Sequence, residues 1–344
     1  MKNEITIEKI FAARHRRQTS RRVKLGFLLV ILLILSSCAL LYGQTIYSVS
    51  EVWQVLGGKF VAGASFTILE LRLPRLLAAL LAGMSFGIAG LVFQTLLRNP
   101  LANPDILGIS SGSSCAVVIC ILVFHTSQTV RIIAAVGAGI GTVLLLFGLS
   151  NQRSLATTRL VIIGLGLQAF YNAVISYFTV NGDQRDLPEA LRCLNGSLDG
   201  ISLNQLPLLD GALLLLVPVI FYFGQRIQLL NLGEEVARSL GVNVGQTKII
   251  LLATTVILTA LATAVTGPIA FVSFLAGPLT NKIMGQTGNN ALAAGIFGAC
   301  LVIAADLVGQ YAFVYRFPVG VITGLIGAPY LILQLIHLSK RGAG

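Results

Sequence analysis

Residues 108–112, Gly-Ile-Ser-Ser-Gly, match the G-x-S-x-G pattern of the nucleophile elbow in serine hydrolases. That elbow requires a strand before the turn, with an acid and a histidine supplied from elsewhere. Here apolar runs of helical length flank the motif, and the three histidines lie near helix or chain ends: His15, His125 and His337. The pattern therefore indicates a helix N-terminus whose Ser110 and Ser111 pack closely or line a path.

Asp306 lies inside the apolar run 291–311, about five residues from its end, or roughly 7 Å deep at 1.5 Å per residue. A carboxylate in hydrocarbon is costly, so its side chain should face protein, water or an arginine. We prefer a structural pairing. A proton relay in an ion-coupled transporter is the alternative.

Two arginines, Arg72 and Arg75, flank Pro74 at the start of another apolar run. Proline fits the first turn of a helix, where its missing N–H costs nothing. The two arginines would then share one helix face at the membrane surface. They could contact lipid headgroups as snorkelling anchors, or form a docking site for an acidic partner.

The chain lacks the patterns that bind nucleotides or metals. It has no G-x-x-x-x-G-K-[ST] phosphate loop, since Trp53 stands where Gly58-Lys59 would need the first glycine. Any ATP-driven action must therefore use an ATPase on another chain. The five cysteines show no paired or ligand spacing, so we interpret them as structural thiols: Cys38, Cys115, Cys120, Cys193 and Cys300.

The composition requires lipid as the main solvent. Of 344 residues, 55% are hydrophobic and 11% charged, with a mean hydropathy of +0.85. The net charge of +11 is scattered over short segments between apolar runs, which membrane topology explains better than nucleic-acid binding.

A spanning helix needs about 20 largely apolar residues. This rule predicts an all-α polytopic membrane protein with ten spans, at 25–45, 74–96, 106–125, 130–149, 159–180, 208–226, 247–267, 269–285, 291–311 and 319–338. They form a single permease-like domain, 25–338, between a basic tail (1–24) and a short tail (339–344). The basic start and Leu35-Ser36-Ser37-Cys38 resemble a lipoprotein signal, but the first apolar run is long enough to be a retained helix.

The basic residues predict the orientation. With both termini in the cytoplasm, 17 of the 24 Lys and Arg fall on the cytoplasmic side and 7 outside. This asymmetry agrees with the positive-inside rule and with an even number of spans.

Three loops carry recognisable features. Residues 98–105, Arg-Asn-Pro-Leu-Ala-Asn-Pro-Asp, form a stiff cytoplasmic loop suited to contacting another subunit, in which Asn103 or Asp105 could cap the next helix. The outer segment 181–207 could hold a short surface helix at 188–194.

Residues 231–241, Asn-Leu-Gly-Glu-Glu-Val-Ala-Arg-Ser-Leu-Gly, predict a two-turn helix across the cytoplasmic surface. Asn231 and Glu234 have capping-box spacing, and Gly241 is a natural stop. The apolar positions 232, 236 and 240 share one face. So short a helix is marginal alone, so it packs either on its own chain or on a partner.

An ordered series of motifs resembles the FecCD-type permeases, the membrane subunits of ABC importers for ferric siderophores, haem and cobalamin. The series covers about residues 60–338: Arg72-Leu73-Pro74-Arg75, Gly83, Gln94, Arg98-Asn99-Pro100-Leu101-Ala102, Leu107-Gly108, Ala237, Leu240-Gly241, Gly267-Pro268-Ile269-Ala270-Phe271-Val272, Ala305-Asp306, Pro318-Val319-Gly320 and Gly327-Ala328-Pro329.

The resemblance implies ten helices per subunit and two permease subunits, identical or different, around one path. It also implies ABC ATPase subunits in the cytoplasm and an external substrate-binding protein or lipoprotein. Arg72 and Arg75 would meet acidic residues of the binding protein. The helix 231–241 would couple to the ATPase through Asn231, Glu234, Glu235, Ala237, Arg238, Leu240 and Gly241.

The remaining site residues fall into two sets. The cytoplasmic loop contributes Arg98, Asn99, Pro100 and Asp105. The translocation path or its helix packing involves Gly83, Gly87, Gln94, Ser110, Ser111, Gly267, Pro268 and Asp306.

Three positions depart from the family pattern. Residues 278–282 read Pro-Leu-Thr-Asn-Lys where Pro-His-x-x-Arg is common, Gln310 replaces an arginine, and Arg316-Phe317 displaces a glutamate before Pro-Val-Gly. Arg316 could supply a docking charge on the outer side. The departures suggest a divergent branch, such as one half of a heterodimeric permease.

The sequence thus predicts a permease subunit of the bacterial cytoplasmic membrane that imports an iron(III)–siderophore complex. It would bind no cofactor itself, because ATP is hydrolysed by the partner and the iron travels inside its chelator. Haem or cobalamin import, and ion-coupled transport through Asp306, are the alternatives.

Overall fold

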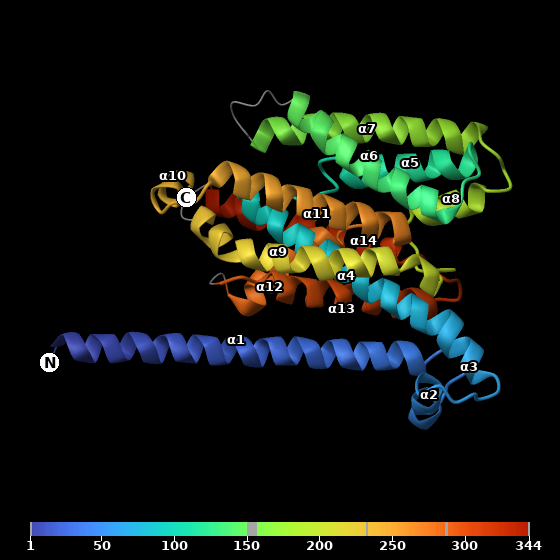
Figure 1. The fold of residues 1–344 in the computed structure, drawn as a ribbon, viewed down its shortest axis with the longest axis horizontal. Coiled ribbons are helices and arrows are strands. Elements are labelled where there is room, and N and C mark those ends of the chain that lie inside the picture. Colours follow the sequence, from blue (N-terminus) through green and yellow to red (C-terminus); the bar gives the residue numbers. More distant parts are fainter. Residues whose placement is uncertain (1, 150–156, 232, 286–287, 343–344) are drawn as a thin grey trace.

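The computed structural model describes residues 2–149, 157–231, 233–285 and 288–342 (Figure 1). Its longer helices are α1 (Lys2–Leu41), α4 (Leu73–Leu96), α5 (Ile109–Leu122), α6 (Gln128–Leu149), α7 (Thr157–Asn181), α9 (Pro207–Asn231), α11 (Val244–Thr266), α12 (Val272–Met284), α13 (Ala291–Tyr311) and α14 (Val319–Gly342). The short ones are α2 (Val49–Leu56), α3 (Ala64–Phe66), the π-helix η1 (Thr67–Arg72), α8 (Leu187–Leu194), the 3-10 helix η2 (Leu203–Gln205) and α10 (Glu234–Ser239). These described residues contain no strand, which confirms the all-α class.

Each of the ten expected segments contains a helix, but eight helices in the described part of the chain are long and apolar enough to cross a membrane. The two shorter ones are α5, with 14 residues, and α12, with 13. Backbone breaks shorten both, because the proline-rich loop precedes α5 and the Gly267-Pro268 turn precedes α12. Ten spans therefore stay a prediction, whereas an integral membrane protein is established.

Both ends of the chain lie at the same end of the molecule. Figure 1 shows α14 ending beside α10 and α1 beginning further out on the same side, with α2, α3 and α8 at the opposite end. We call these the N-terminal end and the opposite end. An even number of crossings requires this arrangement.

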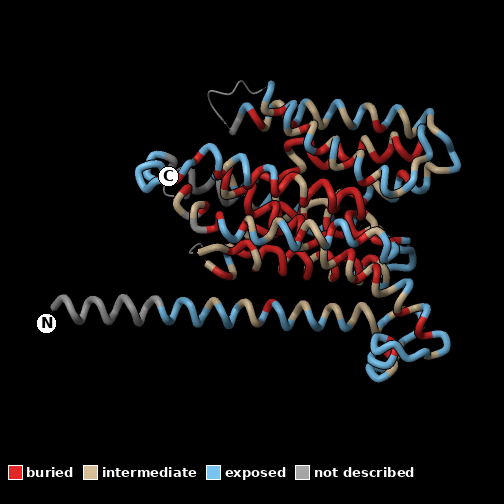
Figure 2. The backbone as a smooth tube through the Cα atoms, viewed as in Figure 1, coloured by how far each residue is buried: buried red, intermediate tan, exposed pale blue. Residues whose placement is uncertain are grey.

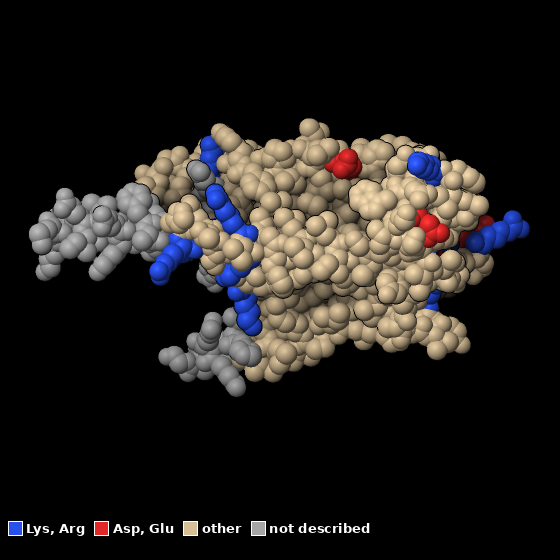
Figure 3. All heavy atoms as spheres, turned by 90° about the horizontal axis from the view of Figure 1, so that it is seen from below, with Lys and Arg blue, Asp and Glu red and all other residues tan. Residues whose placement is uncertain are grey.

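Basic side chains gather near the N-terminal end. Figure 3 shows a dense group of Lys and Arg there and a smaller number at the opposite end. The exposed basic residues just before the apolar part of α1 include Arg16, Arg17, Arg22 and Lys24. This distribution agrees with the expectation that the N-terminal end faces the cytoplasm.

Helix α4 forms the centre of the fold. It packs against α13, α12 and α11, and it is buried along nearly its whole length (Figure 2). In helices α1, α6 and α7, by contrast, most residues of the apolar stretch are not buried in the chain. In a membrane protein these exposed apolar faces are the surface that meets lipid.

Glycines let α4 and α13 approach closely. A Cβ added at Gly83 would lie 2.6 Å from the Cα of Ala299, and one at Gly87 would lie 2.2 Å from the carbonyl oxygen of Ala294. On α13, a Cβ at Gly298 would lie 2.2 Å from the Gly83 oxygen. Such contacts between small residues stabilise helix pairs in lipid, where apolar burial itself drives no association. The geometry therefore supports the interpretation that Gly83 and Gly87 serve helix packing.

Several expected boundaries were wrong. The second span does not begin at Pro74, because a helical segment runs continuously from Ala64 through η1 into α4. The outer segment before it holds α2 and α3. The first helix is longer than expected at its start and ends at Leu41. The surface helix expected at 188–194 is confirmed as α8.

Gly87→Ala should destabilise the bundle by about 1–3 kcal/mol, because the new methyl group overlaps a backbone carbonyl that cannot move without shifting α13. The measurement is thermal unfolding of the purified chain in detergent. Gly137→Ala on α6 is the matched control, since its added Cβ meets nothing within 4 Å. Equal melting temperatures for the two variants would contradict the packing model.

Candidate functional site

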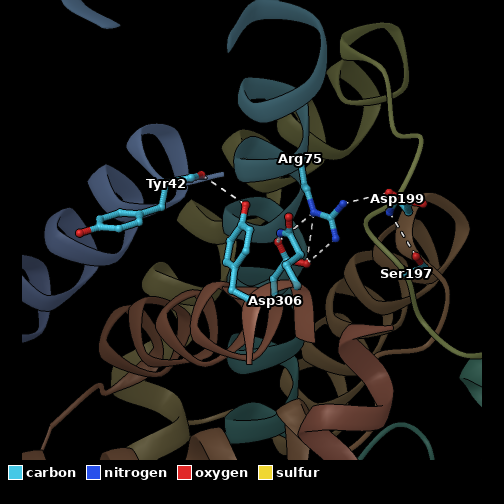
Figure 4. Close-up of polar contacts among 7 residues, drawn as sticks. Tyr42, Arg75, Ser197, Asp199 and Asp306 are labelled. Atoms are coloured by element: carbon cyan, nitrogen blue, oxygen red, sulfur yellow. Dashed lines mark hydrogen bonds and ion pairs between the residues drawn. The ribbon is translucent and has the colours of Figure 1, made fainter. Parts of the chain in front are cut away.

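An ion pair joins α4 to α13 at the opposite end. The guanidinium of Arg75, near the start of α4, donates from Nε to Asp306 Oδ2 (2.9 Å) and Oδ1 (3.2 Å), and from Nη2 to Oδ1 (2.8 Å) (Figure 4). The carboxylate of Asp306 is buried on α13. Bidentate pairing compensates the desolvation of both groups. Asp306 therefore has an arginine partner, Arg75, and the structural role of this pair stays a prediction.

A second carboxylate reaches the same guanidinium from a loop. Arg75 Nη1 donates to Asp199 Oδ1 at 2.9 Å, and the Asp199 side chain is 53% exposed, against 8% for Asp306. The loop is held in place by two hydrogen bonds: Ser197 Oγ accepts from the Asp199 N–H, and the Ser197 N–H donates to the Thr266 carbonyl (Figure 4). The sequence offered no spacing signal for Asp199, which lies 124 residues from Arg75.

Gln310 completes this cluster. Its Nε2 donates to Asp306 Oδ2 at 2.6 Å, one helical turn along α13. The position expected to carry an arginine in the family thus supplies a neutral donor to the same aspartate. One guanidinium faces two carboxylates here, so the cluster of Arg75, Asp199, Asp306 and Gln310 has a net negative charge when all three ionisable groups are charged.

Arg72 does not share the environment of Arg75. Its guanidinium donates to the carbonyls of Leu40 (2.6 Å), Leu41 (3.0 Å) and Thr45 (2.6 Å) at the end of α1, and lies over the ring of Tyr47. A cation at the C-terminal carbonyls of a helix satisfies groups that have no intrahelical partner. Both arginines are therefore bonded within the chain, and their docking to a binding protein stays a prediction.

Three other predicted residues of the opposite end differ in setting. Arg316 is exposed in the segment between α13 and α14. Gly267, with φ of 72°, and Pro268 form a tight turn against the end of α8, where a Cβ at Gly267 would lie 1.9 Å from the Cys193 oxygen. This turn is packed against protein, as the interpretation of helix packing requires.

The loop after α4 is held by its own polar side chains. Arg98, in the left-handed region with φ of 48°, donates from Nη2 to the Leu230 carbonyl at 2.5 Å. Asn99 Oδ1 accepts from the Leu101 N–H, and Asn103 Oδ1 accepts from the Ile106 N–H. These bonds explain the stiffness predicted from the prolines, of which Pro100 is exposed.

Neither Asn103 nor Asp105 caps α5, contrary to expectation. The N-cap is Gly108, in the left-handed region with φ of 78°, and Asp105 instead accepts a hydrogen bond from the Ser110 hydroxyl. Burial raises the pKa of the Asp105 carboxyl, and the bond from Ser110 partly opposes that shift. Asp105 is therefore a structural link between the loop and α5.

The G-x-S-x-G segment is a packed helix start. A Cβ at Gly112 would lie 2.3 Å from Thr142 Oγ1 on α6, while Ser110 is buried and Ser111 half-buried. Gln94, near the end of α4, donates from Nε2 to the Phe274 carbonyl at 3.1 Å. Its side chain occupies the space that a Cβ on Gly277 would need. Gln94 thus joins α4 to α12, and Gly112 allows α5 to approach α6 closely.

Helix α10 lies at the N-terminal end, between α9 and α11. It begins at Glu234 after the N-cap Gly233, so the expected capping box is wrong and Asn231 is the last residue of α9. Gly241 ends the turn with φ of 81°. The side chains of Asn231 and Glu234, and Leu232 as a whole, lie outside the described residues.

The two faces of α10 differ. Ala237 is fully buried on the chain itself, whereas Val236 and Leu240 are 43% and 58% exposed. Glu235 and Arg238 are also exposed. The apolar face of α10 could pack on this chain or on a partner protein. Because Val236 and Leu240 are exposed, we favour packing on a partner protein.

Comparison with known proteins identifies the family. The family model described as the FecCD transport family matches residues 28–337. The chain belongs to the FecCD transport family.

Its relatives cover nearly the whole chain. It is 33% identical to the ferric enterobactin transport system permease protein FepG of Escherichia coli (strain K12), over 91% of this chain and 97% of that protein. It is 34% identical to the Fe(3+)-citrate import system permease protein YfmE of Bacillus subtilis (strain 168), over 95% and 98%. A solved metal-chelate type ABC transporter in an inward-facing conformation matches with a TM-score of 0.78 and 28% identity, over 92% of this chain and 99% of that one.

Asp306→Asn should lower the free energy of unfolding by about 2–4 kcal/mol, because it leaves the half-buried Arg75 without its main counter-charge. Thermal unfolding in detergent measures the effect. Asp199→Asn is the control, and we expect a loss of under about 1 kcal/mol, since that carboxylate is largely solvated. A larger effect at Asp199 would show that the pairing with Asp306 is not the structural one.

Proposed function

We propose that this FecCD-family chain is the membrane permease subunit of an ABC importer for an iron(III)–siderophore complex. It would receive the complex from an external substrate-binding protein and be driven by a separate ATPase in the cytoplasm of a bacterium. Support comes from relatives whose names specify ferric enterobactin, Fe(3+)-citrate and achromobactin transport.

The observation that carries this proposal is α10. A two-turn helix marginal by itself is fixed to the bundle through Ala237 and the ends of α9 and α11, and it presents Val236 and Leu240 outward. An exposed apolar pair on a rigidly held surface helix suits a partner that pushes on it. Motion of α10 would pass directly into two long helices of the bundle.

The loop that begins at Arg98 would act together with α10. The guanidinium of Arg98 donates a hydrogen bond to the carbonyl of Leu230, near the end of α9 that leads into α10. We infer that an ATPase contacting α10 also senses the loop through this bond. The loop follows α4, and α10 follows α9. A partner that contacts both the loop and α10 would therefore couple α4 to α9.

The mechanism that we propose is alternating access. Docking of the binding protein and closure of the ATPases would bias two packings of the same helices. A second permease subunit, identical or different, would complete the path. The chelator would keep the iron in its own ligand shell, so the permease needs shape and weak polar contacts more than metal ligands.

Two alternative functions can be weighed against particular observations. A relative at 30% identity is the vitamin B12 import system permease protein BtuC of Yersinia enterocolitica, so cobalamin is a second candidate substrate. An ion-coupled transporter would need the Asp306 carboxylate available to its coupling ion. That carboxylate instead accepts hydrogen bonds from Arg75 and Gln310.

Uptake into proteoliposomes tests the proposal. With the cognate ATPase and binding protein present, we expect ATP-dependent uptake of a radiolabelled ferric siderophore that unlabelled cobalamin does not compete. Leu240→Asp should abolish uptake and ATPase co-purification without changing the melting temperature, because it places a charge in the partner contact. Leu203→Asp, the same change at an exposed site of the opposite end, should leave ATPase co-purification intact. Uptake by this chain alone would favour the ion-coupled alternative.

Arg316→Glu should weaken docking of the binding protein by roughly fivefold or more, because an exposed cation is replaced by a repelling charge, worth about 1 kcal/mol. Surface plasmon resonance on nanodisc-embedded protein measures the affinity. Arg185→Glu is the matched reversal at another exposed arginine of the same end. An unchanged affinity for Arg316→Glu would remove Arg316 from the docking surface.

A further inference from the structure

Helix α2 has three distinct faces although it is only two turns long. Val52 and Val55 point into the protein, where they form a small apolar cluster with Ala64 and Ile68 and with the end of α1. Ser50, Glu51 and Gln54 form a polar face. The third face carries Val49, Trp53 and Leu56 at the spacing i, i+4, i+7, and it is followed by Phe60.

The third face is apolar, and the described residues of the chain leave it exposed. The exposed fractions are 57% for Val49, 71% for Trp53, 42% for Leu56 and 85% for Phe60. The inner cluster of Val52 and Val55 is complete without these side chains. Exposed apolar surface of this extent, organised on one helix face, requires an occupant.

The helix is firmly built in this orientation. Ser48 and Glu51 form a reciprocal capping box, with Glu51 N–H donating to Ser48 Oγ (3.2 Å) and Ser48 N–H donating to Glu51 Oε2 (2.7 Å). The hydrogen bonds from the Ser48 backbone and hydroxyl lower the pKa of Glu51. The carboxylate of Glu51 marks the polar face of α2.

The position of α2 identifies the occupant. Figure 1 shows α2 at the opposite end of the molecule, to one side of the main bundle and beside the point where α1 ends. The membrane-spanning helix of α1 ends at Leu41, and the next one begins at Ala64. The segment between them, which contains α2, therefore lies at the level where both spans leave the hydrocarbon.

We propose that the face formed by Val49, Trp53, Leu56 and Phe60 inserts into the interface of the outer lipid leaflet and holds α2 parallel to the membrane. A short amphipathic helix with a tryptophan and aliphatic side chains on one face and polar side chains, including one carboxylate, on another is suited to lie in the lipid interface. The exposed Lys59, beside Phe60, is placed to reach lipid phosphate groups. The anchor is coupled to the site described above, because Arg72 connects the end of α1 to the helix that carries Arg75.

Fluorescence tests this directly, because Trp53 is the only tryptophan of the chain. The full chain is reconstituted in nanodiscs of phosphatidylcholine with bromine on the acyl chains either near the headgroup or near the bilayer centre. We expect the loss of most of the Trp53 emission with shallow bromines, a smaller loss with deep ones, and little quenching by aqueous acrylamide. Subtracting the spectrum of Trp53→Phe removes any signal from co-purified proteins.

A matched control moves the probe by one residue. The double variant Trp53→Phe with Gln54→Trp places the indole on the polar face, where we expect strong acrylamide quenching and weak bromolipid quenching. Equal quenching of both probes by bromolipid would overturn the proposal of a face-specific anchor. Acrylamide quenching of Trp53 that only a docked substrate-binding protein prevents would also overturn it, because the face would then be a protein-docking surface.

Discussion

The close approach of α4 and α13 is the constraint on which the rest of the structure depends. Lipid gives two apolar helices no reason to leave it for each other, so their association needs contacts that lipid cannot match. Gly83, Gly87 and Gly298 bring backbone against backbone and leave no room for any side chain. The polar groups of the helix pair can then reach each other, and the pair of Arg75 and Asp306 joins the same two helices at the opposite end.

This arrangement makes α4 the link between the two ends of the molecule. At the N-terminal end, Gln94 binds the backbone of α12, and the loop that follows is bonded through Arg98 to α9. At the opposite end, Arg75 gathers α13 and the loop of Asp199, while Arg72 holds the end of α1. A helix buried along its length and fastened at both ends is suited to transmit a displacement rather than to absorb it.

The opposite end carries cations in two different settings. Arg75 is bonded within a polar cluster in which Gln310 gives Asp306 a neutral donor, whereas Arg316 is exposed on the segment between α13 and α14. A surface charge can meet an external partner with little desolvation, whereas Arg75 must first exchange the carboxylates that it already binds.

The sequence by itself determined the helical class, the approximate course of the apolar segments, the surface helix α8 and the pairing of Asp306, because hydropathy over 20 residues and the cost of a buried charge are local properties. It predicted neither the partner loop of Asp199 nor the separate environments of Arg72 and Arg75. Nor could it predict that α5 and α12 fall short of a full span, or that α2 presents a second apolar face. Those features depend on which residues distant in the chain come into contact, and only the close packing of α4 among α11, α12 and α13 decided that.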